Sequence, residues 1–231
     1  MKVVILAGGK GTRLSEYTKI LPKPMIKIGS KPILEHIINY YMKFGFKDFI
    51  IASGYKHNII KNYFKNKKKY AKIKVISTGV ETLTGLRLKK LKNELKQTFM
   101  LTYGDGLANI NLKKLLNFHK KSKKMITVTA VHPPARFGEL SIVKNTVTKF
   151  EEKPQLQEGW INGGYFVVEP EFLKFIENKN VMLERTPLIK AVKKKKLGAY
   201  KHEGFWFCMD TLRDKKVLDN MIKNKKSPWI K

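Results

Sequence analysis

Near its beginning the chain reads Leu6-Ala7-Gly8-Gly9-Lys10-Gly11-Thr12-Arg13-Leu14, directly after the apolar run at residues 2–6, and continues to Leu21-Pro22-Lys23-Pro24-Met25. The β-branched run predicts a buried strand, and the three glycines predict a sharp turn, because glycine has no Cβ to obstruct the backbone. Free N–H groups in such a loop can face phosphate oxygens, while Arg13 and Lys23 bring two cations to the same anion. The segment therefore indicates a strand that leads into a cradle for a nucleoside triphosphate.

Two common phosphate loops do not fit this spacing. The Walker pattern places four residues between its first glycine and its Gly-Lys pair, and Gly8-Gly9-Lys10-Gly11 lacks that gap. A dinucleotide fingerprint needs a third glycine where Leu14 stands, and a proline follows too soon for an uninterrupted first helix. The remaining alternative, an ordinary turn after a strand, leaves Arg13 and Lys23 unexplained.

Apolar, strand-like runs alternate with amphipathic stretches through the first half of the chain. Strands are predicted at residues 2–6, 49–52, 73–77, 98–102 and 126–131, and helices at 32–44, 58–64 and 112–119. This alternation is typical of an α/β, Rossmann-like fold, with a mainly parallel sheet and helices on both faces. Ligands in such sheets bind beyond the carboxyl ends of the strands, so we expect the glycine loop to lie beside Asp105.

The second half of the chain has shorter elements. Strand-like pieces stand at residues 140–143, 147–150 and 165–168, and helices are predicted at 187–195 and 211–222, around a strand at 198–201. No linker or repeat divides the chain, so we predict one domain over residues 1–231. The first apolar run is too short for a signal peptide and no stretch has the length of a membrane span, which favours a cytoplasmic protein with no membrane partner.

The formal net charge of +30 raises the alternative of a lysine-rich RNA-binding protein. Only five of the 48 basic residues are arginines, however, whereas base readout and tight phosphate binding favour arginine. We therefore interpret most lysines as solvated surface and expect no nucleic-acid partner. The single Cys208 has no partner for an intrachain disulfide and is expected to be buried.

Further motifs follow the glycine loop in a fixed order along the chain. They are Thr78-Gly79, Thr84-Gly85-Leu86-Arg87-Leu88, Thr102-Tyr103-Gly104-Asp105-Gly106, His132-Pro133-Pro134-Ala135-Arg136-Phe137-Gly138, Glu152-Lys153-Pro154, Gly159-Trp160-Ile161-Asn162-Gly163-Gly164, Gly204-Phe205-Trp206 and Met209-Asp210-Thr211-Leu212-Arg213-Asp214. With the loop they resemble the nucleotidyltransferases that activate sugar phosphates, and the resemblance covers nearly the whole chain. Within that family the pattern is most similar to the glucose-1-phosphate cytidylyltransferases.

The resemblance implies an enzyme of the nucleotidyltransferase fold, in which an acceptor phosphate oxygen attacks the α-phosphorus of CTP and pyrophosphate leaves. The second pKa of a phosphate monoester is about 6, so the attacking group is already ionised at neutral pH and needs no basic side chain. The main barrier is repulsion between two polyanions, which cations overcome. CTP, a small phosphorylated acceptor and Mg²⁺ are therefore the expected ligands.

The resemblance also assigns residues to this reaction. Arg13 is expected to hold the β- and γ-phosphates, and Lys23 to bridge the α-phosphate and the acceptor phosphate as the second catalytic cation. The expected nucleotide-binding residues are Leu6, Ala7, Gly8, Gly9, Gly11, Thr12, Arg13, Lys23, Thr84, Gly85 and Asp105, and the expected acceptor-binding residues are Glu152, Lys153, Asn162 and Gly163.

Several of these assignments have a plainer alternative. Thr84 and Gly85 could simply open a helix, Lys153 could be a surface lysine after a strand, and Asn162 to Gly164 could form a hairpin turn. Arg87 is expected either near the base or ribose or in an ion pair with a carboxylate such as that of Glu81.

Asp105 and Asp210 are the candidate metal ligands. The chain has only five aspartates, and Mg²⁺ needs only one or two carboxylates, because water and substrate phosphates supply its other ligands. The two aspartates would have to converge in space from distant positions. The alternatives are a turn residue for Asp105 and a helix cap for Asp210.

The sequence departs from the cytidylyltransferase pattern in three regions. The acidic residue expected after the Gly-Asp-Gly turn is missing, with Ala108 and Asn109 in its region. The link between Phe64 and Ile73 is short and rich in lysine where the family carries a longer excursion that contributes to subunit contacts, so a homo-oligomer stays an open alternative. Phe207-Cys208 also replaces a Gln-Pro-like pair. The acceptor is therefore either glucose 1-phosphate or a phosphorylated amide such as phosphoglutamine, as in the cytidylyltransferases of capsular phosphoramidate synthesis. A uridylyl- or thymidylyltransferase of the same fold is a further alternative.

Overall fold

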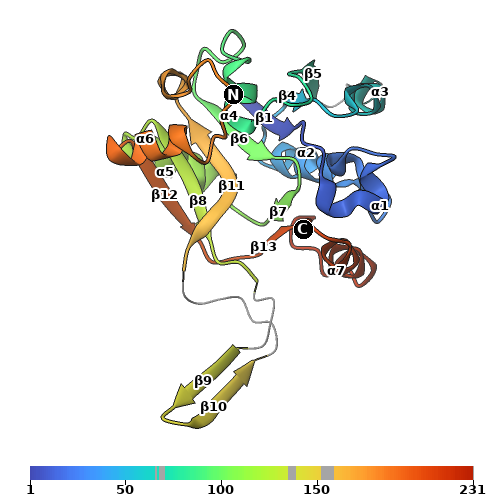
Figure 1. Ribbon diagram of the computed structural model, residues 1–231, viewed down its shortest axis with the longest axis vertical. Coiled ribbons are helices and arrows are strands. Elements are labelled where there is room, and N and C mark those ends of the chain that lie inside the picture. Colours follow the sequence, from blue (N-terminus) through green and yellow to red (C-terminus); the bar gives the residue numbers. More distant parts are fainter. Residues whose placement is uncertain (66, 68–70, 135–138, 152–158, 231) are drawn as a thin grey trace.

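A seven-stranded sheet forms the centre of the computed structural model, which describes residues 1–65, 67, 71–134, 139–151 and 159–230 (Figure 1). Its strand order is β12-β8-β11-β6-β1-β4-β5. All neighbours are parallel except those of β11, which runs antiparallel to both β6 and β8. The strands are β1 (Lys2–Ala7), β4 (Asp48–Ser53), β5 (Lys72–Ser77), β6 (Phe99–Tyr103), β8 (Ile126–Val131), β11 (Ile161–Val168) and β12 (Leu197–His202).

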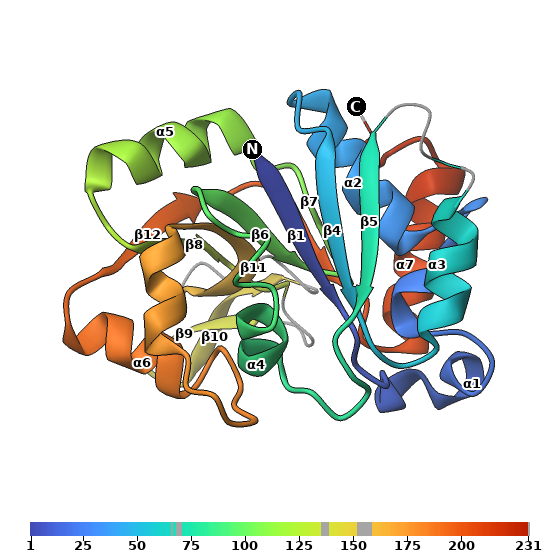
Figure 2. The same ribbon diagram turned by 90° about the horizontal axis from the view of Figure 1, so that it is seen from above.

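Helices cover both faces of the sheet because its strands are apolar on both sides. In β1, Val3 and Ile5 join one hydrophobic cluster, while Val4 and Leu6 join the other. The first cluster includes α2 (Ile33–Lys43), α3 (His57–Lys65), α5 (Leu112–Ser122) and α7 (Leu212–Lys223), and the second includes α4 (Thr84–Lys89), α6 (Thr186–Lys193) and the 3₁₀ helix Pro170–Phe175. Figure 2 shows α2 and α3 on one side of β1, β4 and β5, with α4 on the other.

The strand order changes direction at β1, and this change sets the place of the site. The chain passes from β1 to β4 and β5 on one side, and then crosses to β6 on the other. A crevice forms where such an order reverses, at the carboxyl ends of the strands. The glycine loop follows β1 and Asp105 follows β6, so both reach this crevice. The α/β, mainly parallel fold expected from the sequence is confirmed.

Three short two-stranded ribbons accompany the main sheet. β7 (Gly106–Ala108) pairs with β13 (Trp206–Cys208), β2 (Lys27–Ile28) pairs with β3 (Lys31–Pro32), and β9 (Glu139–Val143) pairs with β10 (Thr146–Glu151). The remaining short helices are α1 (Ser15–Thr18) and the 3₁₀ helices Thr12–Leu14 and Lys23–Met25.

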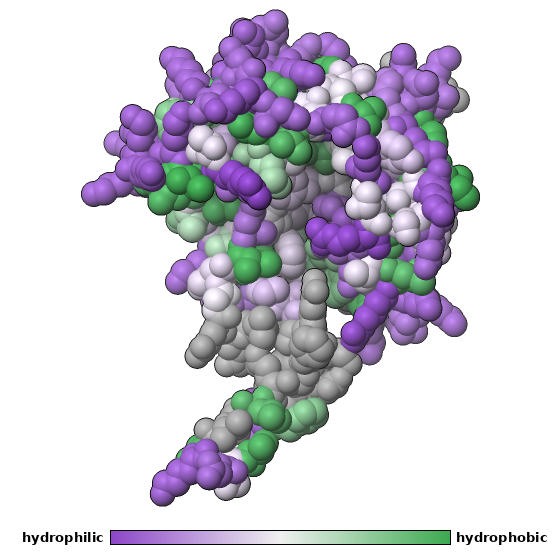
Figure 3. All heavy atoms as spheres, in the orientation of Figure 1, coloured by the Kyte–Doolittle hydropathy of each residue, from purple (hydrophilic) through white to green (hydrophobic). Residues whose placement is uncertain are grey.

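The ribbon of β9 and β10 projects from the rest of the molecule (Figure 1). The apolar side chains of Leu140, Val143, Val147 and Phe150 in this ribbon are exposed, from 51% for Val147 to 63% for Phe150. Figure 3 shows these hydrophobic atoms beside a body whose visible face is mostly hydrophilic, in keeping with the predicted lysine surface. Among the described residues, no helix combines the length and the apolar character that a membrane span requires.

Candidate active site

The glycine loop packs against the lysine that follows it. Gly11 has a φ of 65°, in the left-handed region, and a Cβ at this position would lie 2.8 Å from the Cβ of Lys23. Both the backbone and the packing therefore require glycine here. Gly9 differs, because no heavy atom lies within 4 Å of where its Cβ would be. The loop thus leaves open space at Gly9, where a ligand can approach the backbone.

The ammonium of Lys23 lies between two carboxylates from distant parts of the chain. It donates to Oδ2 of Asp105 and to Oδ1 of Asp210, each at 2.6 Å, and only 13% of its side chain is exposed. Burial alone would lower the pKa of Lys23, but the charge of Asp105 and the hydrogen bonds to both carboxylates raise this pKa above its usual value. Lys23 is therefore fully charged at neutral pH.

The ladder between β7 and β13 brings the two aspartates together. β7 begins directly after Asp105, and Cys208 in β13 pairs with Gly106 in β7. The N–H of Met209 then donates to the carbonyl oxygen of Asp105 at 2.9 Å, and Asp210 is the next residue. Because this ladder fixes both backbones, two aspartates that are far apart in the sequence converge at one point, as the metal prediction required.

Asp210 also binds Arg13, whose Nη1 lies 2.8 Å from Oδ2. Partial burial would raise the pKa of Asp210, but Lys23 and then Arg13 lower it below its usual range. The alternative role of the Asp210 carboxylate, as a helix cap, is wrong. Thr211 caps α7 instead, and Asp214 completes a capping box with it. The Asp210 carboxylate therefore faces two cations and not the helix backbone.

The donor atoms in this cluster fit Mg²⁺. Asp105, Asp210 and Cys208 each offer one ligand atom, and these atoms lie within 4.8 Å of one another. Burial, followed by the charge of Asp105, raises the pKa of the Cys208 thiol well above its usual value. The charged donors are thus carboxylate oxygens, which are the ligands that Mg²⁺ prefers.

Arg87 lies beneath the glycine loop and is only 2% exposed. Nη1 donates to the carbonyl oxygen of Ser53 at 2.8 Å and to Oγ1 of Thr78, and Nη2 donates to the carbonyl oxygen of Thr82 at 2.6 Å. A Cβ at Gly8 would lie 1.9 Å from Nη1, so the guanidinium occupies the space under this glycine. Neutral oxygens of Ser53, Thr78 and Thr82 therefore hold the guanidinium of Arg87, which packs under Gly8 of the loop.

The expected ion pair between Arg87 and Glu81 is wrong. Glu81 binds Lys10 instead, with 2.5 Å between the charged atoms. The side chain of Glu81 is largely exposed, whereas the guanidinium of Arg87 is held inside by Ser53 and Thr78. The two groups do not meet because the Glu81 carboxylate lies at the surface while the Arg87 guanidinium is buried.

A second group of polar residues, which the sequence motifs did not indicate as a unit, lies in the pocket. Glu184 accepts a hydrogen bond from Thr84 Oγ1 at 2.7 Å and another from the hydroxyl of Tyr103. Burial and the charge of Glu184 raise the pKa of Tyr103 above its usual value, so its hydroxyl stays protonated. Glu184 stands two residues before a helix, where an acidic residue is ordinarily interpreted as helix capping, so only its contacts with Thr84 and Tyr103 identify it. Thr84 itself does open a helix, α4, as its alternative predicted.

Asn162 and Gly163 lie inside strand β11, so their alternative as a hairpin turn is wrong. The pairing of β11 with β8 shifts its register between Asn162 and Phe166, as at a β-bulge. Within this irregularity Gly164 has a φ of 76° and donates its N–H to Oδ1 of Asn162 at 2.8 Å. Trp206 donates its indole N–H to the carbonyl oxygen of Gly163 at 2.7 Å. Gly163 and Gly164 both line the pocket, so the irregular part of β11 forms part of its wall.

These groups meet in one pocket of about 520 Å³. The predicted residues that line it are Leu6, Gly8, Gly9, Arg13, Thr84, Asp105, Asn162, Gly163 and Asp210. Lys23 contacts two of these lining residues, Asp105 and Asp210. Ala7 is instead buried in β1, and Gly85 packs against the carbonyl oxygen of Val181. Thr12 is exposed. Glu152 and Lys153 lie outside the residues that the structure describes.

Comparison with known proteins agrees with this geometry. Residues 2–211 match the family model described as Nucleotidyl transferase. A glucose-1-phosphate cytidylyltransferase of Salmonella typhi is 42% identical over 99% of this chain and 98% of its own length, and a probable one of Bacillus subtilis is 38% identical over 99% of both chains.

Solved structures share the fold at lower identity. A putative glucose-1-phosphate thymidylyltransferase of Bacillus anthracis gives a TM-score of 0.77 at 17% identity, covering 97% of this chain and 96% of that one. A UDP-glucose pyrophosphorylase bound to UDP-glucose gives 0.75 at 17% identity, covering 97% and 98%. The fold, the site and the full-length relatives together place this chain in the nucleotidyl transferase family, and it is an enzyme of that family.

Proposed function

We propose that the protein transfers CMP from CTP to the phosphate of glucose 1-phosphate and releases pyrophosphate. The observation that carries the proposal is the cluster of Lys23, Arg13, Asp105 and Asp210 at the pocket beside the glycine loop. The names of the 42% and 38% identical relatives supply the nucleotide and the acceptor.

The cations at the pocket suit a reaction between two polyanions. Lys23 is charged and partly buried, so its field is weakly screened, and it suits the α-phosphate and the attacking phosphate oxygen. Arg13 is 73% exposed, and its fork can reach out to the departing β- and γ-phosphates. In this proposal both side chains act by neutralising charge, and no proton transfer is needed.

Asp105 and Asp210 would hold Mg²⁺ through their carboxylate oxygens. When bound, the ion would neutralise phosphate charge and help to align the triphosphate. The low pKa of Asp210 keeps that carboxylate ionised over the neutral range, which favours cation binding.

The polar wall formed by Glu184, Tyr103 and Asn162 suits an acceptor with several hydroxyl groups. Glu184 is fixed by its two donors, and a carboxylate has further lone pairs that can accept hydrogen bonds from sugar hydroxyls. The amide of Asn162 can donate as well as accept. An amide N–H could also use Glu184, so a phosphorylated amide such as phosphoglutamine belongs in the same test.

Pyrophosphate release tests the proposal. The purified protein is incubated with Mg²⁺ and CTP, UTP, dTTP or GTP, each with glucose 1-phosphate and without it, and the product is identified by mass. We expect release to need both substrates and to be fastest with CTP. Faster turnover with UTP or dTTP would overturn the nucleotide assignment, and turnover with phosphoglutamine but not glucose 1-phosphate would overturn the acceptor.

The metal assignment is tested separately with two aspartate variants. Asp210→Asn should raise the Mg²⁺ concentration for half-maximal turnover by about tenfold or more, because the amide lacks the charge of the carboxylate. Asp219→Asn is the matched control, since Asp219 binds Lys215 on α7 and does not line the pocket. Equal Mg²⁺ dependence of the two variants would remove Asp210 from the metal site.

A further inference from the structure

A second cavity, far from the glycine loop in the sequence, lies between helix α3 and strand β5. Its volume is about 990 Å³. It is lined by Lys61, Asn62, Phe64, Lys65, Ala71, Lys72, Ile73, Lys74 and Val75, and we call it the α3–β5 groove. Phe64 and Ile73 give it an apolar floor, and they are only 2% and 8% exposed.

β5 is the edge strand of the seven-stranded sheet. It pairs with β4 on one side, and no described residue continues the sheet on its other side. An edge strand carries a row of backbone N–H and C=O groups that can pair with an added strand. The groove therefore offers backbone hydrogen bonds along the six residues of β5 as well as an apolar floor.

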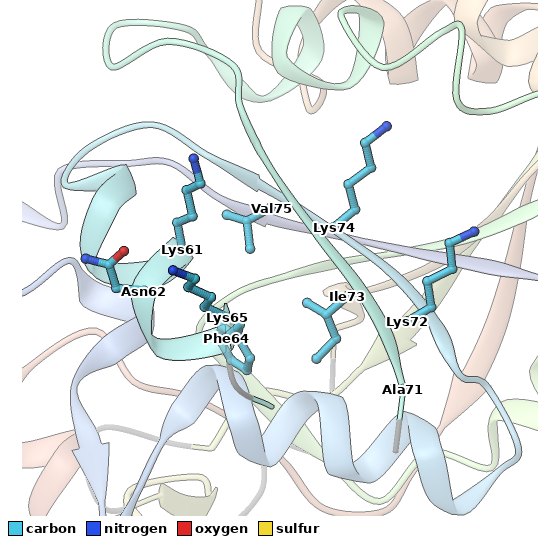
Figure 4. Close-up of a pocket in the computed structure, with 9 residues that line it drawn as sticks. All are labelled: Lys61, Asn62, Phe64, Lys65, Ala71, Lys72, Ile73, Lys74 and Val75. Carbon is cyan, nitrogen blue, oxygen red and sulfur yellow. The ribbon is translucent and has the colours of Figure 1, made fainter. Parts of the chain in front are cut away.

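Lysines stand on both sides of this edge. Figure 4 shows Ile73 and Val75 directed toward α3, where Lys61 and Lys65 lie, and shows Lys72 and Lys74 directed the opposite way. All four lysines are exposed, and none of the lining residues is acidic. Lys74 binds Glu94 at 2.5 Å, which leaves the other three without an ion pair among the described residues. The groove is thus a site of concentrated positive charge.

We propose that the α3–β5 groove binds an extended acidic segment of a partner protein, which adds to the sheet beside β5. Successive side chains of an added strand point to opposite faces, so acidic residues on both faces would meet lysines on both faces. A compact anion would reach only one side of the edge. A second copy of this chain would bring its own lysines against these, and that repulsion disfavours self-pairing.

Binding of a labelled peptide to the intact protein tests this proposal. The probe is a peptide of about eight residues that repeats Glu-Glu-Val-Val, which places glutamates on both faces of the added strand, and its length is matched to an edge strand. Its partner probe has the same sequence with alternate backbone amides methylated, so it keeps the charge but cannot pair. We expect the first to bind, to slow amide hydrogen exchange in β5 and to lose affinity with salt, and the methylated peptide to bind about tenfold more weakly or not at all.

Variants locate the binding in the groove. Lys61→Gln with Lys65→Gln should weaken peptide binding about fivefold to tenfold, because two ammonium groups are removed from one wall. Lys120→Gln with Lys121→Gln, on the exposed end of α5, is the matched control and should change binding less than about twofold. Pyrophosphate release should be the same in both variants, so this proposal stands or fails independently of the proposed function.

Three results would show that binding does not depend on strand pairing in the groove, and each would overturn the proposal. They are equal binding of the methylated peptide, an equal loss of binding in the α5 control, and displacement of the peptide by single-stranded RNA of the same charge at lower concentration. Each would mean that the lysines attract polyanions without strand pairing. Absence of any peptide binding would overturn it as well.

Discussion

Lys23, which is partly buried, and Arg87, which is buried, are both cations beside the glycine loop, yet their surroundings differ in kind. Lys23 faces two carboxylates, Asp105 and Asp210, which themselves line the pocket. Arg87 donates to two carbonyl oxygens and a hydroxyl and has no acidic partner among the described residues. Lys23 is therefore held by carboxylates that can also bind a ligand or a metal ion, while Arg87 is held mainly by backbone carbonyl oxygens.

This difference indicates that Lys23 takes part in the reaction and that Arg87 stabilises the structure around the loop. A charge that is balanced by flexible carboxylates can change partners during a reaction, because its hydrogen bonds are replaceable. A buried guanidinium that donates to fixed backbone carbonyls cannot move without losing those hydrogen bonds inside the protein. We therefore expect changes at Lys23 to affect turnover and changes at Arg87 to affect stability.

The largest effect is expected from Lys23→Ala. Turnover should fall by about 10³-fold, equivalent to about 4 kcal/mol of transition-state stabilisation, because a partly buried cation is lost from the reacting phosphates. Circular dichroism should show an unchanged fold. Lys19→Ala, at an exposed lysine of the same segment, is the control and should keep normal turnover. Near-normal turnover of Lys23→Ala would refute its catalytic role.

Arg87→Met should lower the free energy of unfolding by about 2–4 kcal/mol, because it removes the hydrogen bonds that the buried guanidinium donates to Ser53, Thr78 and Thr82. Urea denaturation measures the change. Arg185→Met is the matched control, since Arg185 is exposed, and it should alter stability by less than about 0.5 kcal/mol. If the two variants were equally stable, the support that we assign to Arg87 would be disproved.

Gly8 and Gly9 also differ in role, because Gly8 packs against Arg87 and Gly9 borders open space. Gly8→Ala should lower the free energy of unfolding by about 1–3 kcal/mol, because its Cβ would overlap the guanidinium of Arg87. Gly9→Ala meets no atom within 4 Å, so it should leave stability unchanged and raise the KM for CTP severalfold if the ligand approaches there. Urea denaturation and steady-state kinetics measure the two effects. Equal destabilisation by both variants would contradict this account of the loop.

The smallest effect concerns pH. The pKa of Asp210 is lowered in the folded protein, so the stabilisation it gains from Lys23 and Arg13 is fully present above the ordinary value of 3.8. It is lost as the pH falls through the lower folded value. The stability difference between the wild type and Asp210→Asn should therefore be constant from neutral pH to just above 3.8 and shrink below it. Urea denaturation over this range checks the sign, and a difference that grows in acid would contradict it.

Local patterns were sufficient for the fold class. The apolar runs predicted the strands of the main sheet to within a residue or so at most ends, because strands buried on both faces must be continuously apolar. β11 is the exception. It begins at Ile161, four residues before the predicted start, since Asn162 to Gly164 looked like a turn and the pairing with β8 overrides that local preference.

The sequence by itself determined the glycine loop, the cations that follow it and the alternation that builds a parallel sheet, because each depends on the conformational freedom or periodicity of neighbouring residues. Only the tertiary structure decided what those groups contact. Lys23 meets Asp105 and Asp210 across separations of 82 and 187 residues. Arg87 forms no ion pair with Glu81 and instead donates hydrogen bonds to two backbone carbonyl oxygens and the hydroxyl of Thr78. Such contacts depend on which strands pair and which side chains lose water, and no local pattern encodes either.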